Sequence, residues 1–162
     1  MIRSEISLFL KNVPGELGKL AKLFEENKIN IDALTIQDAS AYVQEIFKAR
    51  GKSIKRIASS NSYSAMQKDA AEFALIRLLV DQTEQAIDVL SQHSYIFDTK
   101  AVVVMELDNN PGQLAAVARK LGDEDINIEY VYGTVAEPGQ KCLFVFCPDN
   151  VDKAVAVFRQ EM

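Results

Sequence analysis

The chain is poor in the residues that most catalytic and metal sites need. It contains one histidine, His93, and two cysteines among 162 residues. One imidazole, at an expected helix end, supports neither a Ser/His/Asp nor a Cys/His catalytic set. Cys142 and Cys147 lie an odd number of residues apart on one expected strand, so they should face opposite ways and form neither a disulfide nor a metal pair. With no glycine-rich nucleotide motif either, we expect no catalysis, no metal and no cofactor.

Long apolar runs and an excess of basic charge are also missing. No run is long enough to span a bilayer, and the N-terminal segment 1–5 lacks the charged-then-apolar layout of a signal peptide. The net charge of −5 argues against a nucleic-acid partner. The composition, 48% hydrophobic and 25% charged, is typical of a globular protein. We expect a cytoplasmic protein, since cysteine is scarce, with neither a membrane nor a nucleic acid as partner.

The strongest positive feature is an internal repeat. Segment 12–15, Asn-Val-Pro-Gly, returns at 109–112 as Asn-Asn-Pro-Gly, a shift of 97 residues. The same shift relates the apolar stripes that follow the two turns, and it maps Ile-Asn-Ile at 29–31 onto Ile-Asn-Ile at 126–128. A duplicated module that keeps a polar turn and a polar strand residue suggests two related sites, or one site made by both copies.

Both copies show the same order of elements. The first is expected to contain strands 5–11, 29–37 and 73–80, helix 15–27, and a helix opened by a capping box at 81–84. The second is expected to contain strands 102–107, 126–135 and 141–147, helix 112–122, and a last helix capped at 149–152. A further strand at 95–99 should bend at 98–100 into the second copy.

This order predicts an α+β fold of two ferredoxin-like βαββαβ units in tandem, with the sheets side by side and the helices on one face. The units should span 1–99 and 100–162. The second unit lacks a fourth strand, and because an open sheet edge invites association, we expect a partner to cover it, which favours a homodimer.

The first unit carries an insertion. The aspartates that open the second helices, Asp81 and Asp149, differ by 68 rather than 97 residues, so the first copy has 29 extra residues at about 40–68. One interpretation is one or two helices with a solvated basic face. The other is a docking or lid element, since long loops inside compact units are often functional.

The two Asn-x-Pro-Gly turns have the chemistry of an amino-acid site. Proline directs the chain out of the strand, and glycine lets the backbone approach a ligand closely. The helix that follows offers free N–H groups and a positive dipole end to a carboxylate. Asn12 and Asn109 supply both a donor and an acceptor, which suits a zwitterion. The alternative is that each asparagine only caps a turn.

Asn30 and Asn127 are a second repeated polar feature. Each lies near the start of an apolar strand, where an amide costs free energy if it is buried without partners. One such residue alone would indicate a turn next to a helix end. With two such residues at matching positions, beside Asp32 and Glu129, ligand binding explains them as well as a turn does.

With these motifs the chain resembles tandem ACT-domain proteins, a family of small regulatory modules that bind amino acids. The resemblance covers residues 3–39 with 70–99, and 100–162. It implies that an amino acid is held between the first turn of one unit and the second strand of the other. One implied site uses Asn12, Pro14, Gly15 and Leu17 with Asn127, and its mate uses Asn109, Pro111, Gly112 and Leu114 with Asn30.

The ligand's side chain is less certain from these residues. Within the family, the serine-sensing domain of phosphoglycerate dehydrogenase is the most similar at the two asparagine positions. It has a histidine two residues before the turn asparagine, where this chain has Leu10 and Leu107, which favours a less polar ligand. Tyr130 and Tyr132 are candidates to frame that ligand's side chain, with plain packing as the alternative.

Two functions follow. The first is a non-catalytic regulatory protein whose amino-acid ligand changes dimerisation or the activity of a partner. The alternative is a structural dimerisation or protein-interaction module without a ligand. Other uses of the fold need basic, aromatic inner strands for RNA, a cysteine pair for metal transfer, or an arginine-bearing phosphate loop, and these features are missing. Any regulated enzyme is expected to be a separate polypeptide, with 40–68 as the candidate docking segment.

Overall fold

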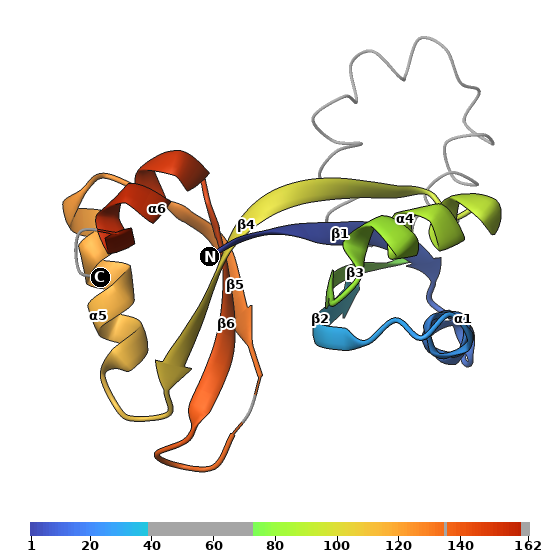
Figure 1. Cartoon of the computed structure of the whole chain (residues 1–162), viewed down its shortest axis with the longest axis horizontal. Helices are drawn as coiled ribbons and strands as arrows, with labels where there is room; N and C mark the ends of the chain where they lie inside the picture. Colours follow the sequence, from blue (N-terminus) through green and yellow to red (C-terminus); the bar gives the residue numbers. More distant parts are fainter. Residues whose placement is uncertain (39–72, 135, 160–162) are drawn as a thin grey trace, which may run out of the picture. The chain divides into compact units, whose positions relative to one another are not determined.

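The computed structural model describes residues 1–38, 73–134 and 136–159 (Figure 1). The expected insertion at 40–68 lies outside the described residues. The elements are β1 (Ile2–Lys11), α1 (Glu16–Glu26), β2 (Ile31–Asp38), β3 (Phe73–Val80), α4 (Thr83–Gln92), β4 (Phe97–Asp108), α5 (Gln113–Asp123), β5 (Ile128–Gly133), β6 (Lys141–Pro148) and α6 (Val151–Arg159). This order confirms the α+β fold with two ferredoxin-like repeats.

The chain divides into two compact units. We call Ser7–Asp98 the N-terminal unit, and Thr99–Met162 together with Met1–Ile6 the C-terminal unit. The strand order is β2-β3-β1-β4-β6-β5. Strands β1 and β4 each contribute one part to either unit, so the first six residues of the chain belong to the C-terminal unit.

In the N-terminal unit, β2 pairs with β3 in antiparallel register from Ile31 opposite Val80 to Asp38 opposite Ala74. Strand β3 is buried at six of its eight positions, as its almost continuous apolar sequence predicts. The helices bury one stripe each, at a spacing of three and four residues. The buried residues are Leu20 and Phe24 of α1, and Ala86, Val89 and Leu90 of α4.

In the C-terminal unit, β6 lies between β4 and β5 and is antiparallel to both. Helices α5 and α6 cover one face of these strands (Figure 1). The interior of this face is apolar and joins all three strands to both helices. Its buried residues are Val103, Leu107, Val117, Leu121, Ile126, Phe146 and Ala154.

The start of β1 takes the place where a fourth strand of the C-terminal unit is expected. The Met1 amino group donates to the Val104 carbonyl, and the Val104 N–H donates to the Met1 carbonyl, both at 2.8 Å. Such reciprocal bonds are typical of antiparallel strands. From the sequence we expect a partner chain on this side of β4, whereas the structure shows the chain's own N-terminus there. This part of the strand could not be predicted, because the polar residues Arg3 and Ser4 interrupt the apolar alternation.

The strand expected at 95–99 runs into the strand expected at 102–107, because β4 is continuous from Phe97 to Asp108. One local expectation is wrong. The aspartates Asp81 and Asp149 do not cap the helices that follow them. Helix α4 has Gln82 at its N-cap without a side-chain cap bond, and at α6 it is the Asn150 side chain that accepts from the Lys153 N–H, at 2.9 Å.

Candidate functional site

The two Asn-x-Pro-Gly turns have nearly the same backbone geometry. Gly15 has φ 92° and ψ −15°, and Gly112 has φ 95° and ψ −16°. Side chains other than glycine rarely adopt this left-handed conformation. A Cβ atom added at either position would meet nothing within 4 Å. The backbone conformation alone therefore requires glycine here, and space remains in front of each turn.

Each turn leads into a helix whose N-terminus has no side-chain cap. The Glu16 N–H donates to the Val13 carbonyl at 3.4 Å, and in the second copy the Gln113 N–H donates to the Asn110 carbonyl at 3.3 Å. The N–H groups that follow are the ones an α-helix leaves without internal partners. Their positive dipole end favours a bound carboxylate.

Leu17 and Leu114 lie in the first turns of these helices. The helical periodicity predicts that both belong to the buried stripe. The structure instead leaves them 38% and 41% exposed, because the core side of each helix begins one turn later, at Leu20 and Val117. Two leucines at matching positions are thus accessible next to the uncapped helix ends. Leu10 and Leu107, in contrast, are buried and belong to the core.

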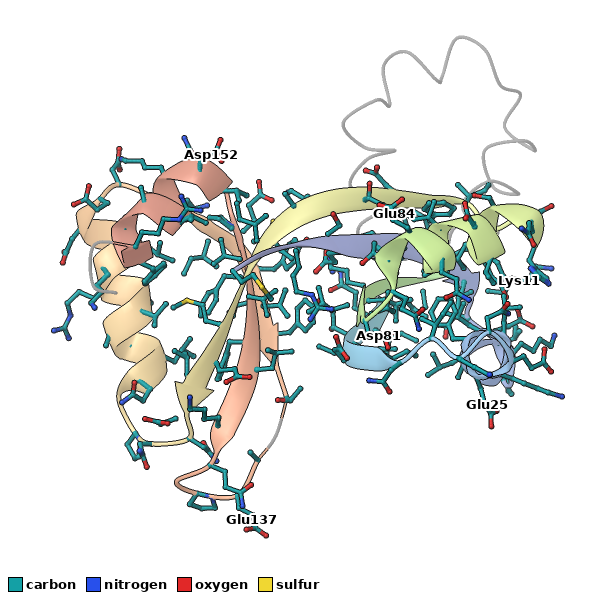
Figure 2. The ribbon with its side chains drawn as sticks, viewed as in Figure 1. Lys11, Glu25, Asp81, Glu84, Glu137 and Asp152 are labelled. Atoms are coloured by element: carbon teal, nitrogen blue, oxygen red, sulfur yellow. The ribbon has the colours of Figure 1, made fainter. Side chains whose placement is uncertain are left out.

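Each strand asparagine is held by two reciprocal hydrogen bonds between its main chain and an aspartate. The Asn30 N–H donates to Asp81 Oδ1 at 2.8 Å, and the Asp81 N–H donates to the Asn30 carbonyl at 3.1 Å. Asp81 follows β3 and is labelled in Figure 2. In the second copy the Asn127 N–H donates to Asp149 Oδ1 at 3.2 Å, and the Asp149 N–H returns to the Asn127 carbonyl at 3.0 Å. Each aspartate therefore ties the residue before one strand to the end of its neighbour.

The side-chain amides of the four predicted asparagines differ. The Asn30 Nδ2 donates to Asp32 Oδ1 at 3.0 Å. The Asn109 Nδ2 donates to the Ala136 carbonyl at 2.7 Å, in the loop between β5 and β6 where Figure 2 labels Glu137. The amides of Asn12 and Asn127 form no side-chain hydrogen bond to any residue that the structure describes. All four residues are exposed.

Tyr130 and Tyr132 bind a carboxylate of the chain itself. The Tyr130 hydroxyl donates to Glu5 Oε1 at 2.6 Å, and the Tyr132 hydroxyl donates to Glu5 Oε2 at 2.7 Å. Glu5 is fully buried. Burial, followed by the hydrogen bond to Glu5, raises the pKa of Tyr130 above its usual range, so this hydroxyl stays a donor. The two tyrosines thus hold Glu5 instead of framing a ligand, a role that the alternating pattern around Glu5 did not indicate.

A small ion pair lies beside these tyrosines. The Lys100 ammonium bonds the Glu129 carboxylate, and the Cys147 thiol lies 3.4 Å from Glu129 Oε2. The hydrogen bond from Lys100, with a smaller contribution from Cys147, lowers the pKa of Glu129. The Lys100 Nζ also lies 5.9 Å from the centre of the Tyr130 ring. Because the pair is exposed, it adds little stability, but it does occupy Glu129.

The C-terminal unit also has an open groove of about 990 Å³ beside α6. None of the ten sequence-predicted site residues lines it. The groove is largely apolar, and its walls come from β1, β4, β6 and α6. The lining residues are Met1, Ile2, Arg3, Val103, Val104, Met105, Glu106, Leu143, Val155, Phe158 and Arg159.

The described residues contain neither a metal-binding cluster nor a membrane-spanning helix. Between residues 1 and 159, leaving out 39–72 and 135, no three His, Cys, Asp or Glu side chains gather in a group that could hold a metal ion. Within the same ranges, no helix has the length and apolar character to cross a membrane.

The structure brings the turn residues of each copy to one helix N-terminus. In the N-terminal unit these are Asn12, Pro14, Gly15 and Leu17, and in the C-terminal unit they are Asn109, Pro111, Gly112 and Leu114. It places Asn30 and Asn127 directly before β2 and β5. The joining of a turn from one copy with the strand asparagine of the other stays a prediction.

The geometry can be compared with known proteins. The chain is similar to protein BT0572 from Bacteroides thetaiotaomicron, with 24% identity, a TM-score of 0.73, and coverage of 99% of this chain and 89% of that chain. It is also similar to the regulatory subunits of aspartate kinase from Thermus thermophilus (13% identity, TM-score 0.57) and Thermus flavus (13% identity, TM-score 0.53), each covering 99% of this chain and 94% of the other. At these identities the likeness shows the fold.

No match is found among curated proteins. A family model described as an ACT domain pair matches residues 45–161. Since this match spans well over half of the sequence, the chain belongs to the ACT domain pair family.

Proposed function

We propose that the chain is a non-catalytic regulatory protein that binds a small amino acid at the two duplicated turns. The observation that carries this proposal is the near identity of the two turns. Gly15 and Gly112 have the same left-handed geometry, and each precedes a helix without a side-chain cap. An uncapped helix end next to an exposed asparagine offers donors to a carboxylate and an acceptor to an ammonium group.

In this proposal the N–H groups of the first helical turn bind the ligand carboxylate. The side-chain oxygen of an asparagine accepts from the ligand ammonium, and Leu17 or Leu114 contacts its side chain. The aspartate kinase structures with the same fold are named as regulatory subunits, which supports a regulatory role. Regulation further requires that the ligand bind two states of the protein, or of its complex with an enzyme, with different affinity.

A thermal-shift screen of the full chain with each of the twenty amino acids tests the proposal. An amino acid present at a hundred times its dissociation constant should stabilise the fold by about 2.7 kcal/mol. For a chain of this length this amounts to a rise in Tm of roughly 5–10 °C. The double variant Asn12→Ala/Asn109→Ala should remove the rise without lowering the Tm of the free protein by much, because both residues are exposed.

If none of the twenty amino acids raises the Tm, the sensor role is wrong and the alternative, an interaction module without a ligand, takes its place. Analytical ultracentrifugation then becomes the informative measurement.

We keep the homodimer as a prediction, although its first argument no longer holds because the sheet edge beside β4 is filled by the chain's own N-terminus. A separate enzyme as partner and a cytoplasmic setting, which the free buried cysteines support, belong to the same proposal.

A further inference from the structure

The open groove beside α6 lies within the C-terminal unit and contains none of the residues assigned to the amino-acid sites. Its walls come from the start of β1, from β4, from β6 and from the second half of α6. With a volume of about 990 Å³ it has the size of sites that hold small molecules. The groove is therefore a candidate for a second ligand, different from an amino acid.

The walls of the groove are mostly apolar side chains that the core leaves accessible. Met105, Val155 and Phe158 pack against the core of the C-terminal unit, but each is only partly buried. At the start of β1, Met1 and Ile2 are 76% and 44% exposed. Continuous apolar surface of this kind is typical of binding sites, and methionine side chains adapt to ligands of different shape. The groove thus suits a flexible apolar ligand.

The charges of the groove differ from those of the whole chain. The chain has a net charge of −5, yet the ionisable side chains among the described residues that line the groove are Arg3, Arg159 and Glu106. The Glu106 Oε2 lies 3.8 Å from the Lys141 Nζ, which offsets its charge. Arg159 is exposed and forms no hydrogen bond or ion pair with the residues that the structure describes. A guanidinium group in this position can bind a carboxylate through two parallel hydrogen bonds.

Two other occupants fit these charges less well. A second copy of the chain, related by a twofold axis through the groove, would bring the arginines of both copies into one patch, and like charges at an interface are unfavourable. The insertion at 40–68 is itself basic. Its cationic residues between 48 and 56 are Lys48, Arg50, Lys52, Lys55 and Arg56. A small acidic ligand meets neither objection.

We infer that this groove binds a fatty acid, with the hydrocarbon chain against Met105, Val155 and Phe158 and the carboxylate on Arg159. The inference does not depend on amino-acid binding, because the two kinds of site share no residue. Each methylene group that leaves water for apolar surroundings strengthens binding roughly fourfold. The affinity should therefore rise with chain length until the ligand is longer than the groove.

Isothermal titration calorimetry of the full chain with octanoate, decanoate and dodecanoate, each below its critical micelle concentration, tests the inference. We expect one ligand per chain and an affinity that rises roughly tenfold with each added pair of methylene groups. Dodecyltrimethylammonium has the same hydrocarbon chain with a cationic head group. It should bind roughly tenfold more weakly than dodecanoate, because its head group meets the arginines.

Two variants of α6 test the position of the ligand. Arg159→Gln should weaken dodecanoate binding roughly fivefold, the effect of one exposed ion pair. Val155→Asp puts a carboxylate into the apolar wall and should weaken binding roughly thirtyfold. The matched control is Lys153→Gln, which removes the same charge from α6 at a residue that bonds the Glu124 carbonyl and does not line the groove. It should leave the affinity within roughly twofold.

Three results would overturn the inference, with the melting temperature of each variant checked first. One is the absence of binding by all three carboxylates. Another is equal affinity for dodecanoate and dodecyltrimethylammonium, or a loss in Lys153→Gln as large as in Arg159→Gln. The third is a dimer in analytical ultracentrifugation that Val155→Asp dissociates and dodecanoate does not affect, which would assign the groove to a second copy. None of these results bears on the amino-acid screen, whose failure would leave the groove untouched.

Discussion

The hydrogen bonds to Glu5 should make a measurable contribution to stability. Glu5 is fully buried, and each of its carboxylate oxygens accepts one tyrosine hydroxyl, at 2.6 Å and 2.7 Å. A hydrogen bond to a charged group contributes about 1.5–3 kcal/mol. Tyr130→Phe and Tyr132→Phe should therefore each lower the free energy of unfolding by about 2 kcal/mol, and the double variant by about 4 kcal/mol.

The assay is reversible urea or thermal unfolding followed by circular dichroism. For a chain of this length, a loss of about 2 kcal/mol lowers the Tm by roughly 4–8 °C. Tyr95→Phe is the matched control, because Tyr95 is half-buried and its hydroxyl makes no hydrogen bond to the described residues. It should change the stability by less than about 0.5 kcal/mol.

The reasoning is refuted if Tyr130→Phe and Tyr132→Phe are as stable as the Tyr95→Phe control. A double-mutant cycle with Glu5→Gln gives a second check. If the hydroxyl of Tyr130 acts through the Glu5 carboxylate, its removal should cost less in the Gln background, with a coupling energy of about 0.5–3 kcal/mol. A coupling energy of zero would show that the two groups do not interact in solution.

Three further predictions concern the backbone and the pH dependence. Gly15→Ala should destabilise the fold by about 1–2 kcal/mol, because Gly15 has a left-handed backbone conformation. The control is Gly18→Ala, inside α1 and with open space around it, which should stabilise the fold by about 0.5–1 kcal/mol. Equal changes in the free energy of unfolding for the two variants, measured in urea, would contradict this prediction. Asp81→Ala should cost about 1 kcal/mol through the lost bond to Asn30, and Asp81→Asn, which keeps the acceptor, should recover most of it in the same assay. Because the pKa of Tyr130 is raised above 10 in the folded state, the unfolded chain releases this proton first, so the stability should fall as the pH rises above about 10; the fall should be smaller in Tyr130→Phe, and an identical slope would count against the assigned cause.

Much of the fold follows from local patterns in the sequence. The continuous apolar run of β3 gives the same bounds in the sequence and in the structure, Phe73–Val80. The predicted and observed helices agree to within one or two residues at their ends, because their apolar stripes repeat at the helical period. Because the sequence is duplicated, each helix or strand predicted in one copy was supported by the equivalent segment of the other copy.

Contacts between distant residues could not be predicted in this way. Nothing local indicates that Met1 pairs with Val104, or that Glu5 lies between two tyrosines more than a hundred residues away. Asp81 and Asp149 have the sequence signature of helix caps. In the structure their side chains instead accept hydrogen bonds from the main-chain N–H groups of Asn30 and Asn127.

The candidate site divides along the same line. The two turns themselves follow from the motif, because proline directs the chain out of the strand and glycine permits a backbone conformation that other residues rarely adopt. Which amides are free depends in part on a carbonyl in the loop between β5 and β6. This contact has no signal in the sequence around Asn109.

The most direct test of amino-acid binding is a nuclear magnetic resonance titration of the 18.0 kDa chain, labelled with nitrogen-15, with each amino acid in turn. The side-chain amide signals of asparagine report on hydrogen bonds to the ligand. For at least one amino acid we predict saturable shifts of the Asn12 and Asn109 side-chain signals and of the Leu17 and Gly18 backbone N–H signals. Spectra in which these signals do not move with any amino acid, even at millimolar concentration, would contradict the account.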